Sequence, residues 1–359
     1  MDEKNKIKTN SQKGDFSNFS FGYNKTAYSA KRKIVKQMEK QGYRFVGNHS
    51  AVKICRWTKK SLIDEGVCYK EQFYGIKAHL CCQMTPWLGC PNKCIHCWRA
   101  IELDFNKFIN KEKIDSPSEV IEGCIKAQRK LIEGFKILPE TKDKTPSRAN
   151  MEKWKEAQEP MQFAISLSGE PTAYPMIGDL IEELRKRGKT SFLVTNGLYP
   201  EKIKELIEKN QLPTQLYVSV NTSNKKLYQG FHRSSKKDAW ERLSKTLGLL
   251  PDIGCRTVFR MNLVRELNMK KEFIQEFAEL IKKSRPLFIE LKGYMSVGFA
   301  RERLGYDKMP SHEEMKEFSK KLVIVLNSLG EEYKILGEKI ESRVFVLGKD
   351  KEKLKIKKI

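Results

Sequence analysis

The run Cys90-Pro-Asn-Lys-Cys94-Ile-His-Cys97-Trp98 places three cysteines in the pattern C-x3-C-x2-C, followed by an aromatic residue. It comes directly after residues 80–86, which are expected to form a short strand, so it occupies the loop at the carboxyl end of that strand. Three thiolates can hold three irons of a four-iron, four-sulfur cluster and leave the fourth iron open to a small ligand. The pattern therefore predicts a 4Fe-4S cluster on these cysteines.

Zinc and disulfide bonds are the alternatives for this run. Structural zinc sites close with four ligands, often in C-x2-C pairs, and no second pair lies at zinc-finger spacing here, although His96 could supply a fourth donor. A disulfide framework does not suit a chain of 359 residues with nine cysteines. The iron–sulfur interpretation is therefore favoured, with zinc as the alternative.

The rest of the chain alternates between predicted strands and helices. Strands are expected at 80–86, 161–167, 191–194, 216–220, 257–263 and 287–291, and helices at 116–131, 176–186, 201–208, 237–249, 271–282 and 312–327. The first helix starts at Ser116-Pro-Ser-Glu119, with an N-cap serine, proline at N1 and glutamate at N3. Such alternation implies an α/β fold with a parallel sheet and right-handed crossovers. Residues 333–336 and 343–347 are expected to add a terminal hairpin.

Polar residues gather where these strands end. They are Ser168-Gly169-Glu170-Pro171, Thr195-Asn196-Gly197, Ser219 with Asn221, Arg260 with Asn262, and Lys292-Gly293. In parallel α/β folds the functional site forms at the carboxyl ends of the strands. These residues and the cysteine loop are therefore expected to surround one site.

This combination resembles the radical S-adenosylmethionine (radical SAM) enzymes, and the resemblance implies a partial (β/α)6 barrel. It implies that the cluster of Cys90, Cys94 and Cys97 cleaves S-adenosyl-L-methionine to a 5′-deoxyadenosyl radical. Ser168-Gly169-Glu170 stands where the family holds the methionine amino group, with serine in place of a glycine, and Trp98 where it packs near adenine. The remaining cofactor-binding residues that the resemblance implies are Thr195, Asn196, Ser219 and Asn221.

A second set, Cys55-x12-Cys68-x12-Cys81, lies upstream of the first. Three more thiolates suggest a second cluster with an open iron, while free buried thiols are the alternative. Cys82, beside Cys81, leaves open a slip of one residue in the ligand set. Cys124 and Cys255 are expected to be packing residues.

The surrounding sequence narrows the family. Runs such as Cys55-Arg-Trp-Thr, Gly66-Val-Cys68-Tyr-Lys70 and Phe288-Ile-Glu-Leu-Lys292 make residues 30–348 similar to the archaeal tRNA 4-demethylwyosine synthases. The resemblance implies tRNA-Phe carrying N1-methylguanosine, pyruvate and two 4Fe-4S clusters. Asn221 and Ser223 depart from the family, where Asp and Pro are more usual, so contacts at the fourth strand are expected to differ.

Lys70 matches the family lysine that is thought to form a Schiff base with pyruvate. A lysine amine can attack a carbonyl in this way. The residues alone give Lys70 no preference over Lys59 or Lys77, so the assignment depends on the resemblance. No flavodoxin-like segment precedes residue 50, and we therefore expect a separate ferredoxin or flavodoxin to supply electrons.

The formal net charge of +24 is concentrated at the two ends. Residues 1–60 carry 15 Lys/Arg against 4 Asp/Glu, and residues 349–359 carry 6 Lys against 2 acids. Such ends suggest binding to a polyanion, most simply nucleic acid, although solvated surface charge is the alternative. Arg233, Arg260 and Arg301 are the candidates for tRNA contacts at the rim of the barrel.

Four segments are expected. Residues 1–30 form a basic, disordered arm, 31–78 an N-terminal extension with the second-cluster ligands, 79–330 the radical SAM core, and 331–359 a hairpin and basic tail. No stretch approaches the ~18 apolar residues of a membrane span, so a cytoplasmic protein is expected. A monomer is expected as well. The competing functions are another radical SAM RNA-modifying enzyme and a non-catalytic, metal-containing tRNA-binding protein.

Overall fold

A single ten-stranded mixed sheet organises the chain in a computed structural model that describes residues 34–136 and 149–357. The strand order is β1-β2-β3-β4-β5-β6-β7-β8-β10-β9. The strands are β1 (Tyr43–Val46), β2 (Ser50–Lys53), β3 (Cys81–Thr85), β4 (Gln162–Ile165), β5 (Thr190–Thr195), β6 (Gln215–Ser219), β7 (Arg256–Leu263), β8 (Phe288–Gly293), β9 (Lys334–Lys339) and β10 (Val344–Gly348). The arm expected at residues 1–30 lies outside the described residues.

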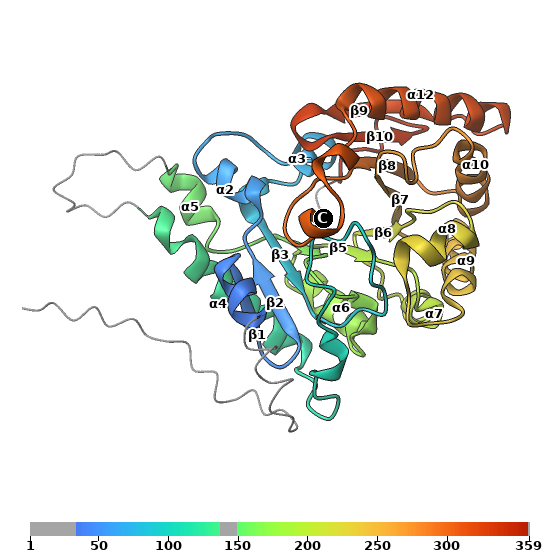
Figure 1. The fold of residues 1–359 in the computed structure, drawn as a ribbon. Helices are drawn as coiled ribbons and strands as arrows, with labels where there is room; N and C mark the ends of the chain where they lie inside the picture. Colours follow the sequence, from blue (N-terminus) through green and yellow to red (C-terminus); the bar gives the residue numbers. More distant parts are fainter. Residues whose placement is uncertain (1–33, 137–148, 358–359) are drawn as a thin grey trace, which may run out of the picture.

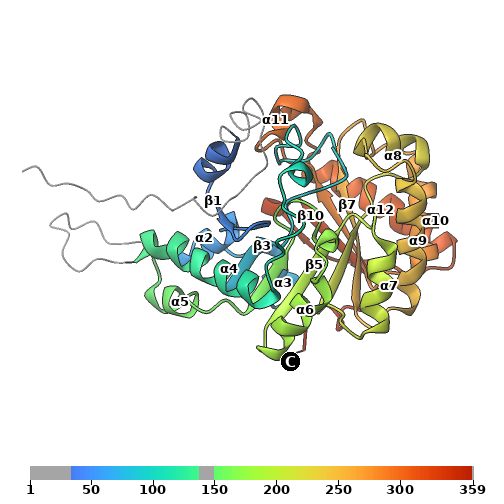
Figure 2. The same cartoon turned by 90° about the horizontal axis from the view of Figure 1, so that it is seen from below.

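Strands β3 to β8 are parallel and correspond to the six strands expected from the sequence. The sheet curves into a partial barrel with helices on its outer side (Figures 1 and 2). The helices are α4 (Pro117–Ile132), α5 (Met151–Glu156), α6 (Ile177–Lys186), α7 (Pro200–Glu208), α8 (Lys225–His232), α9 (Ala239–Leu249), α10 (Phe273–Ser284), α11 (Ala300–Arg303) and α12 (His312–Ser328). The expected α/β class and the partial barrel of six parallel strands are thereby confirmed.

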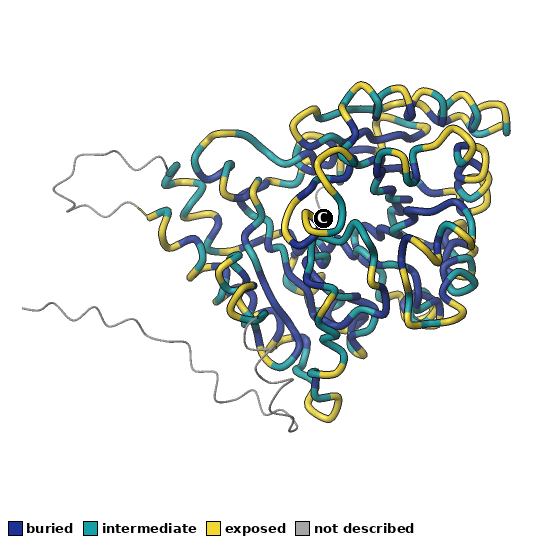
Figure 3. The backbone as a smooth tube through the Cα atoms, viewed as in Figure 1, coloured by how far each residue is buried: buried dark blue, intermediate teal, exposed yellow. Residues whose placement is uncertain are grey.

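The main hydrophobic core lies between the sheet and this helical layer. Its members include Phe163, Leu193 and Ile289 on the strands, all fully buried. Figure 3 shows the strands as buried segments inside a partly exposed outer layer. The predicted capping box at Ser116 and Glu119 is present, and it fixes the start of α4.

The N-terminal extension joins the same sheet, which the sequence analysis did not predict. Strands β1 and β2 form a hairpin, and β2 pairs antiparallel with β3. Two short helices follow, α2 (Arg56–Leu62) and α3 (Tyr69–Tyr74). At the other edge, β10 pairs antiparallel with β8 and β9, so the expected terminal hairpin also extends the sheet.

The last described residues lie at the end of the barrel where the parallel strands begin. Arg256, the first residue of β7, donates to the carbonyls of Lys353 and Leu354 at 2.6 and 2.8 Å. Leu354 is buried, and the Ile356 amide donates to the carbonyl of Tyr74 at 3.1 Å. This segment therefore contributes to packing. No helix among the described residues has the length and apolar character needed to cross a bilayer.

Candidate functional site

One cavity of about 450 Å³ opens at the carboxyl ends of the parallel strands. It is lined by both sets of three cysteines and by most of the residues expected from the sequence. These are Cys55, Cys68, Lys70, Cys81, Cys90, Cys94, Cys97, Trp98, Ser168, Gly169, Glu170, Thr195, Asn196, Ser219, Asn221, Arg260 and Lys292. We call Cys90, Cys94 and Cys97 the loop triad, and Cys55, Cys68 and Cys81 the dispersed triad.

The end of α8 braces the loop triad. The amides of Lys93 and Ile95 donate to the carbonyls of His232 and Phe231 at 2.9 and 3.0 Å. The Nδ1 atom of His232 lies 3.0 Å from the sulfur of Cys94. When Cys94 is a thiolate, this nitrogen must carry the proton and donate it, because a thiolate only accepts.

Two arginines fix the same loop, and the sequence analysis identified neither. Arg99 donates to the carbonyls of Ser166 and Leu167 at 2.8 and 2.9 Å, which ties the loop to the end of β4. Arg303 donates to the carbonyls of Cys97 and Arg99 from α11. Arg99 lies close to the cysteines in sequence but its partners do not, and Arg303 lies about 200 residues away, so spacing along the chain gives no signal of either role.

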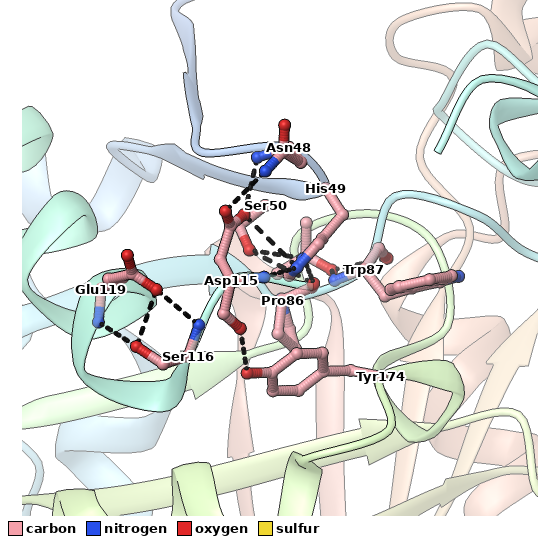
Figure 4. A network of polar contacts seen from close by, with 10 residues as sticks. Asn48, His49, Ser50, Pro86, Trp87, Asp115, Ser116, Glu119 and Tyr174 are labelled. Carbon is pink, nitrogen blue, oxygen red and sulfur yellow. Dashed lines mark hydrogen bonds and ion pairs between the residues drawn. The ribbon is translucent and has the colours of Figure 1, made fainter. Parts of the chain in front are cut away.

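A buried histidine anchors the segment just before the loop (Figure 4). The Asp115 amide donates to Nε2 of His49 at 2.9 Å, so Nδ1 carries the ring proton and donates to the Pro86 carbonyl at 2.6 Å. Burial lowers the pKa of His49, which favours this neutral form. The carbonyl of His49 also accepts from the Leu88 amide at 3.0 Å. The turn between β1 and β2 thus holds the path of the chain into the cluster loop.

The dispersed triad comes from three different elements. Cys55 is the N-cap of α2, where its sulfur accepts from the Thr58 amide at 3.3 Å, and Cys68 is the N-cap of α3. Cys81 is the first residue of β3 and lines the cavity. Cys82 is fully buried in the core on the opposite side of the strand, because successive strand residues face opposite ways.

Each triad supplies three cysteine sulfurs to the same cavity, which is the donor set of a 4Fe-4S cluster with one open iron. Among the described residues, no three His, Cys, Asp or Glu side chains form a group that could ligate a single metal ion. Burial raises the pKa of Cys90 to about 12 and that of Cys68 to about 11. Iron binding would have to displace these thiol protons.

The wall next to the loop triad contains the expected cofactor-binding segment. Gly169 has φ +68°, and a Cβ there would lie 1.9 Å from the carbonyl oxygen of Trp87, so only glycine fits. Glu170 is buried, which raises its pKa, and its carboxylate accepts from Thr195 Oγ1 at 2.6 Å and the Asn196 amide at 2.8 Å. Trp98 stacks on Tyr43 with ring centroids 6.0 Å apart.

The wall next to the dispersed triad carries the cations. Lys70 is 8% exposed, and its Nζ lies 4.8 and 5.1 Å from the ring centroids of Phe192 and Tyr217. Lys59 and Lys77 are exposed and do not line the cavity. Lys292 faces the same space, and burial together with the Arg260 guanidinium lowers its pKa to about 8.

The three arginines expected to bind tRNA are in different places. Arg233 is exposed at the end of α8. Arg301 lines a second cavity of about 530 Å³ that shares Cys55 and Trp98 with the first. Arg260, expected at the rim of the barrel, faces the inside of the barrel, and its contact with tRNA stays a prediction. It lies on the inner face of β7, with its guanidinium 5.9 Å from the centroid of the Tyr217 ring. Residues 256, 258, 260 and 262 share this face, because every second residue of a strand points the same way.

Comparisons with known proteins agree with this geometry. Residues 84–281 match the family model of the Radical SAM superfamily, and residues 283–349 match that of Wyosine base formation. The S-adenosyl-L-methionine-dependent tRNA 4-demethylwyosine synthase of Pyrococcus abyssi is 44% identical over 318 residues, which are 88% of this chain and 89% of that protein. The enzyme of the same name from Methanocaldococcus jannaschii is 36% identical over 89% of this chain and 97% of its own length.

Solved structures give the same result. A structure of TYW1 with a lysine–pyruvate adduct bound has a TM-score of 0.75 at 35% identity and covers 90% of this chain and 97% of its own. A crystal structure of archaeal TYW1 has a TM-score of 0.69 at 33% identity.

The barrel, the cysteine loop after β3 and the match over residues 84–281 define a radical SAM enzyme, which uses S-adenosyl-L-methionine and a 4Fe-4S cluster. The relatives identify the particular family of radical SAM enzymes. The chain belongs to the S-adenosyl-L-methionine-dependent tRNA 4-demethylwyosine synthases, so the family resemblance found in the sequence is confirmed.

Proposed function

We propose that this protein condenses N1-methylguanosine, immediately 3′ of the anticodon of tRNA-Phe, with pyruvate to give 4-demethylwyosine. The observation that carries the proposal is a single cavity lined by two cysteine triads and the buried Lys70. The family supplies the reaction, and a 35% identical relative has been solved with a lysine–pyruvate adduct.

The two triads would hold clusters with different roles in the reaction. The loop triad would hold the 4Fe-4S cluster that supplies the electron for cleaving S-adenosyl-L-methionine. Ser168, Gly169 and Glu170 would orient the methionine end, and Trp98 would cover the adenine side. Further cofactor contacts would come from Thr195, Asn196, Ser219 and Asn221, which line the same cavity. The dispersed triad would hold a second 4Fe-4S cluster, with residues 31–78 as the extension that supplies two of its ligands.

Lys70 would capture pyruvate. Its Nζ attacks the ketone carbon of pyruvate, water leaves, and a carbon–nitrogen double bond forms. The surrounding Phe192 and Tyr217 rings exclude water from this amine, which disfavours hydrolysis of the imine. The keto acid would thereby be fixed beside the dispersed triad.

The remaining partners follow from the family and the charge. The target base must leave its stack to reach a cavity inside the barrel, and basic residues outside it would bind tRNA phosphates. We propose a separate ferredoxin or flavodoxin as the electron donor, a monomeric state, and a cytoplasmic location with the tRNA.

Anaerobic reconstitution tests the proposal. The protein should bind about eight irons in two clusters and should convert N1-methylguanosine in tRNA-Phe when S-adenosyl-L-methionine, pyruvate and a reduced ferredoxin or flavodoxin are present. Lys70→Ala should lose this conversion and keep both clusters. Zinc with little iron, or turnover with NADPH as the sole reductant, would contradict the cluster assignment or the external donor respectively.

A further inference from the structure

Three cationic side chains face the cavity beside the dispersed triad: Lys70, Arg260 and Lys292. Among the described residues, none of their charged groups makes a hydrogen bond or an ion pair with a protein atom. A buried cation elsewhere in the structure has protein partners: Lys189 forms an ion pair with Glu159 and donates to the Pro160 carbonyl at 2.8 Å. A cation largely removed from water is costly without a partner, and the thiolates of a loaded dispersed triad would offset only part of the three charges, so these cations favour binding of a further anion from the cavity.

Glu290 is a carboxylate near these cations, and it is already engaged. Its two oxygens accept from the hydroxyls of Tyr74 and Tyr69 at 2.6 and 3.2 Å. Glu290 pairs in register with Arg260, one inward-facing position below Lys292 on β8. The negative charge of Glu290 therefore offsets part of the positive charge of Arg260 and Lys292 from the side away from the cavity mouth. The side of the two cations that faces the cavity stays free.

We propose that Arg260 and Lys292 form a carboxylate subsite, which binds the carboxylate of the 2-oxo acid whose ketone Lys70 captures. The inference rests on the proposed function and names the groups that select its small substrate. In a 2-oxo acid the carboxylate is bonded directly to the ketone carbon, so its binding group must lie close to the attacking amine. Lys70 and Arg260 are suited to these two tasks, because both line the same cavity and their charged groups contact the same Tyr217 ring, at 5.1 and 5.9 Å from its centroid.

Arginine suits this task because its planar guanidinium can bind both carboxylate oxygens. Lys292 lies on the neighbouring strand, where it pairs in register with Asn262. Its ammonium is 5.3 Å from the ring centroid of Tyr69, the residue before Lys70. Two cations on adjacent strands and the amine on α3 thus surround one space.

The carboxylate of S-adenosyl-L-methionine is the other candidate ligand, because Arg260 pairs in register with Ser219, a proposed cofactor contact on β6. The remaining ionisable neighbours of Arg260 favour the 2-oxo acid, since they include Tyr69, the residue before Lys70, and the second cation, Lys292. Cleavage of S-adenosyl-L-methionine, measured alongside pyruvate labelling, distinguishes the two carboxylates.

Reductive trapping tests the subsite. The reconstituted full-length protein is incubated anaerobically with pyruvate or its neutral methyl ester, and cyanoborohydride delivers hydride to the imine carbon, giving a stable secondary amine located by peptide mass spectrometry. For Arg260→Gln, the pyruvate concentration giving half-maximal labelling of Lys70 should rise about ten- to a hundredfold, as for loss of a charged hydrogen bond. Lys292→Gln should raise it less, and labelling by the ester should change little in either variant.

Arg256→Gln is the matched control, since it removes a cation from the same face of β7 whose partners, two main-chain carbonyls and the Gln215 side chain, lie at the end of the barrel away from the cavity mouth. It should keep the pyruvate dependence of the wild type. Unchanged half-maximal pyruvate in both test variants, or equal changes for acid and ester, would overturn the subsite. Loss of S-adenosyl-L-methionine cleavage in Arg260→Gln, with pyruvate labelling intact, would assign Arg260 to the other carboxylate. Wild-type labelling on Lys292 in place of Lys70 would instead overturn the role of Lys70 in the proposed function.

Discussion

The loop triad and the dispersed triad are built in opposite ways. The loop triad lies within residues 90–97, in one loop after β3, and distant residues only brace it. The dispersed triad does not exist until α2, α3 and β3 have packed together, because each element contributes one sulfur. A local arrangement is therefore recognisable from spacing alone, whereas the dispersed one depends on the tertiary fold.

The largest expected effect separates the two triads by their chemistry. Replacing Cys90, Cys94 and Cys97 by alanine should abolish cleavage of S-adenosyl-L-methionine. Replacing Cys55, Cys68 and Cys81 should spare some uncoupled formation of 5′-deoxyadenosine and stop formation of the tricyclic base. Iron content should fall from about eight to about four per chain in each variant. A dispersed-triad variant that loses cleavage while the loop-triad variant keeps it would reverse the assignment.

Much of this comparison could be predicted from the sequence. The six strands, the capping box at Ser116 and the loop triad are each marked by a sequence pattern within a few residues, and the structure contains all of them. The hairpin of β1 and β2 was not predicted, because four-residue strands with little alternation carry a weak signal. His49, Arg99, Arg303 and His232 act through contacts more than 35 residues away, which spacing along the chain does not reveal.

A smaller effect should distinguish Cys81 from its neighbour. Cys81→Ser removes a sulfur from the cavity, so the second cluster should be lost or oxygen-labile, with about four irons remaining. Cys82→Ser changes a core residue, and it should keep both clusters while losing about 1–3 kcal/mol of folding free energy from a buried hydroxyl. Iron analysis and thermal unfolding of the pair measure this. The opposite pattern would mean that the ligand register is shifted by one residue.

A subtler effect tests the brace on the loop triad. His232→Phe keeps an aromatic ring against Tyr228, whose centroid is 4.4 Å away, and removes the hydrogen bond to the Cys94 sulfur. Hydrogen bonds to cluster sulfurs raise the potential, so the potential of the loop cluster should fall. The shift should be up to about 60 mV, since one hydrogen bond to a charged group is worth about 1.5 kcal/mol.

Potentiometric titration followed by electron paramagnetic resonance measures this shift. Tyr228→Phe is the control, because it removes a nearby hydroxyl that contacts Asn92 at 3.3 Å and not the sulfur. An unchanged potential in His232→Phe, or an equal shift in the control, would show that the contact with Cys94 is structural only.

The smallest effects are expected far from both triads, at the basic ends. Deletion of residues 1–30 should weaken tRNA binding and flatten the dependence of log affinity on log salt by roughly 0.7–0.9 for each phosphate that is no longer neutralised. Replacing Arg233 and Arg301 by glutamine should act similarly and more strongly at the modified anticodon loop, because Arg301 lines the cavity beside Trp98.

Removal of residues 349–359 should behave differently, although the sequence alone suggested a second tRNA-binding end. Leu354 is buried, and Arg256 binds two carbonyls of this segment at the end of the barrel where the strands begin, away from the cavity mouth. This truncation should therefore lower the melting temperature and leave the salt slope close to that of the wild type. Filter binding across a salt series, with melting curves for each variant, compares the two ends. A flattened slope without loss of stability in the C-terminal truncation would restore this segment as a tRNA-binding element and place bound tRNA at both ends of the barrel.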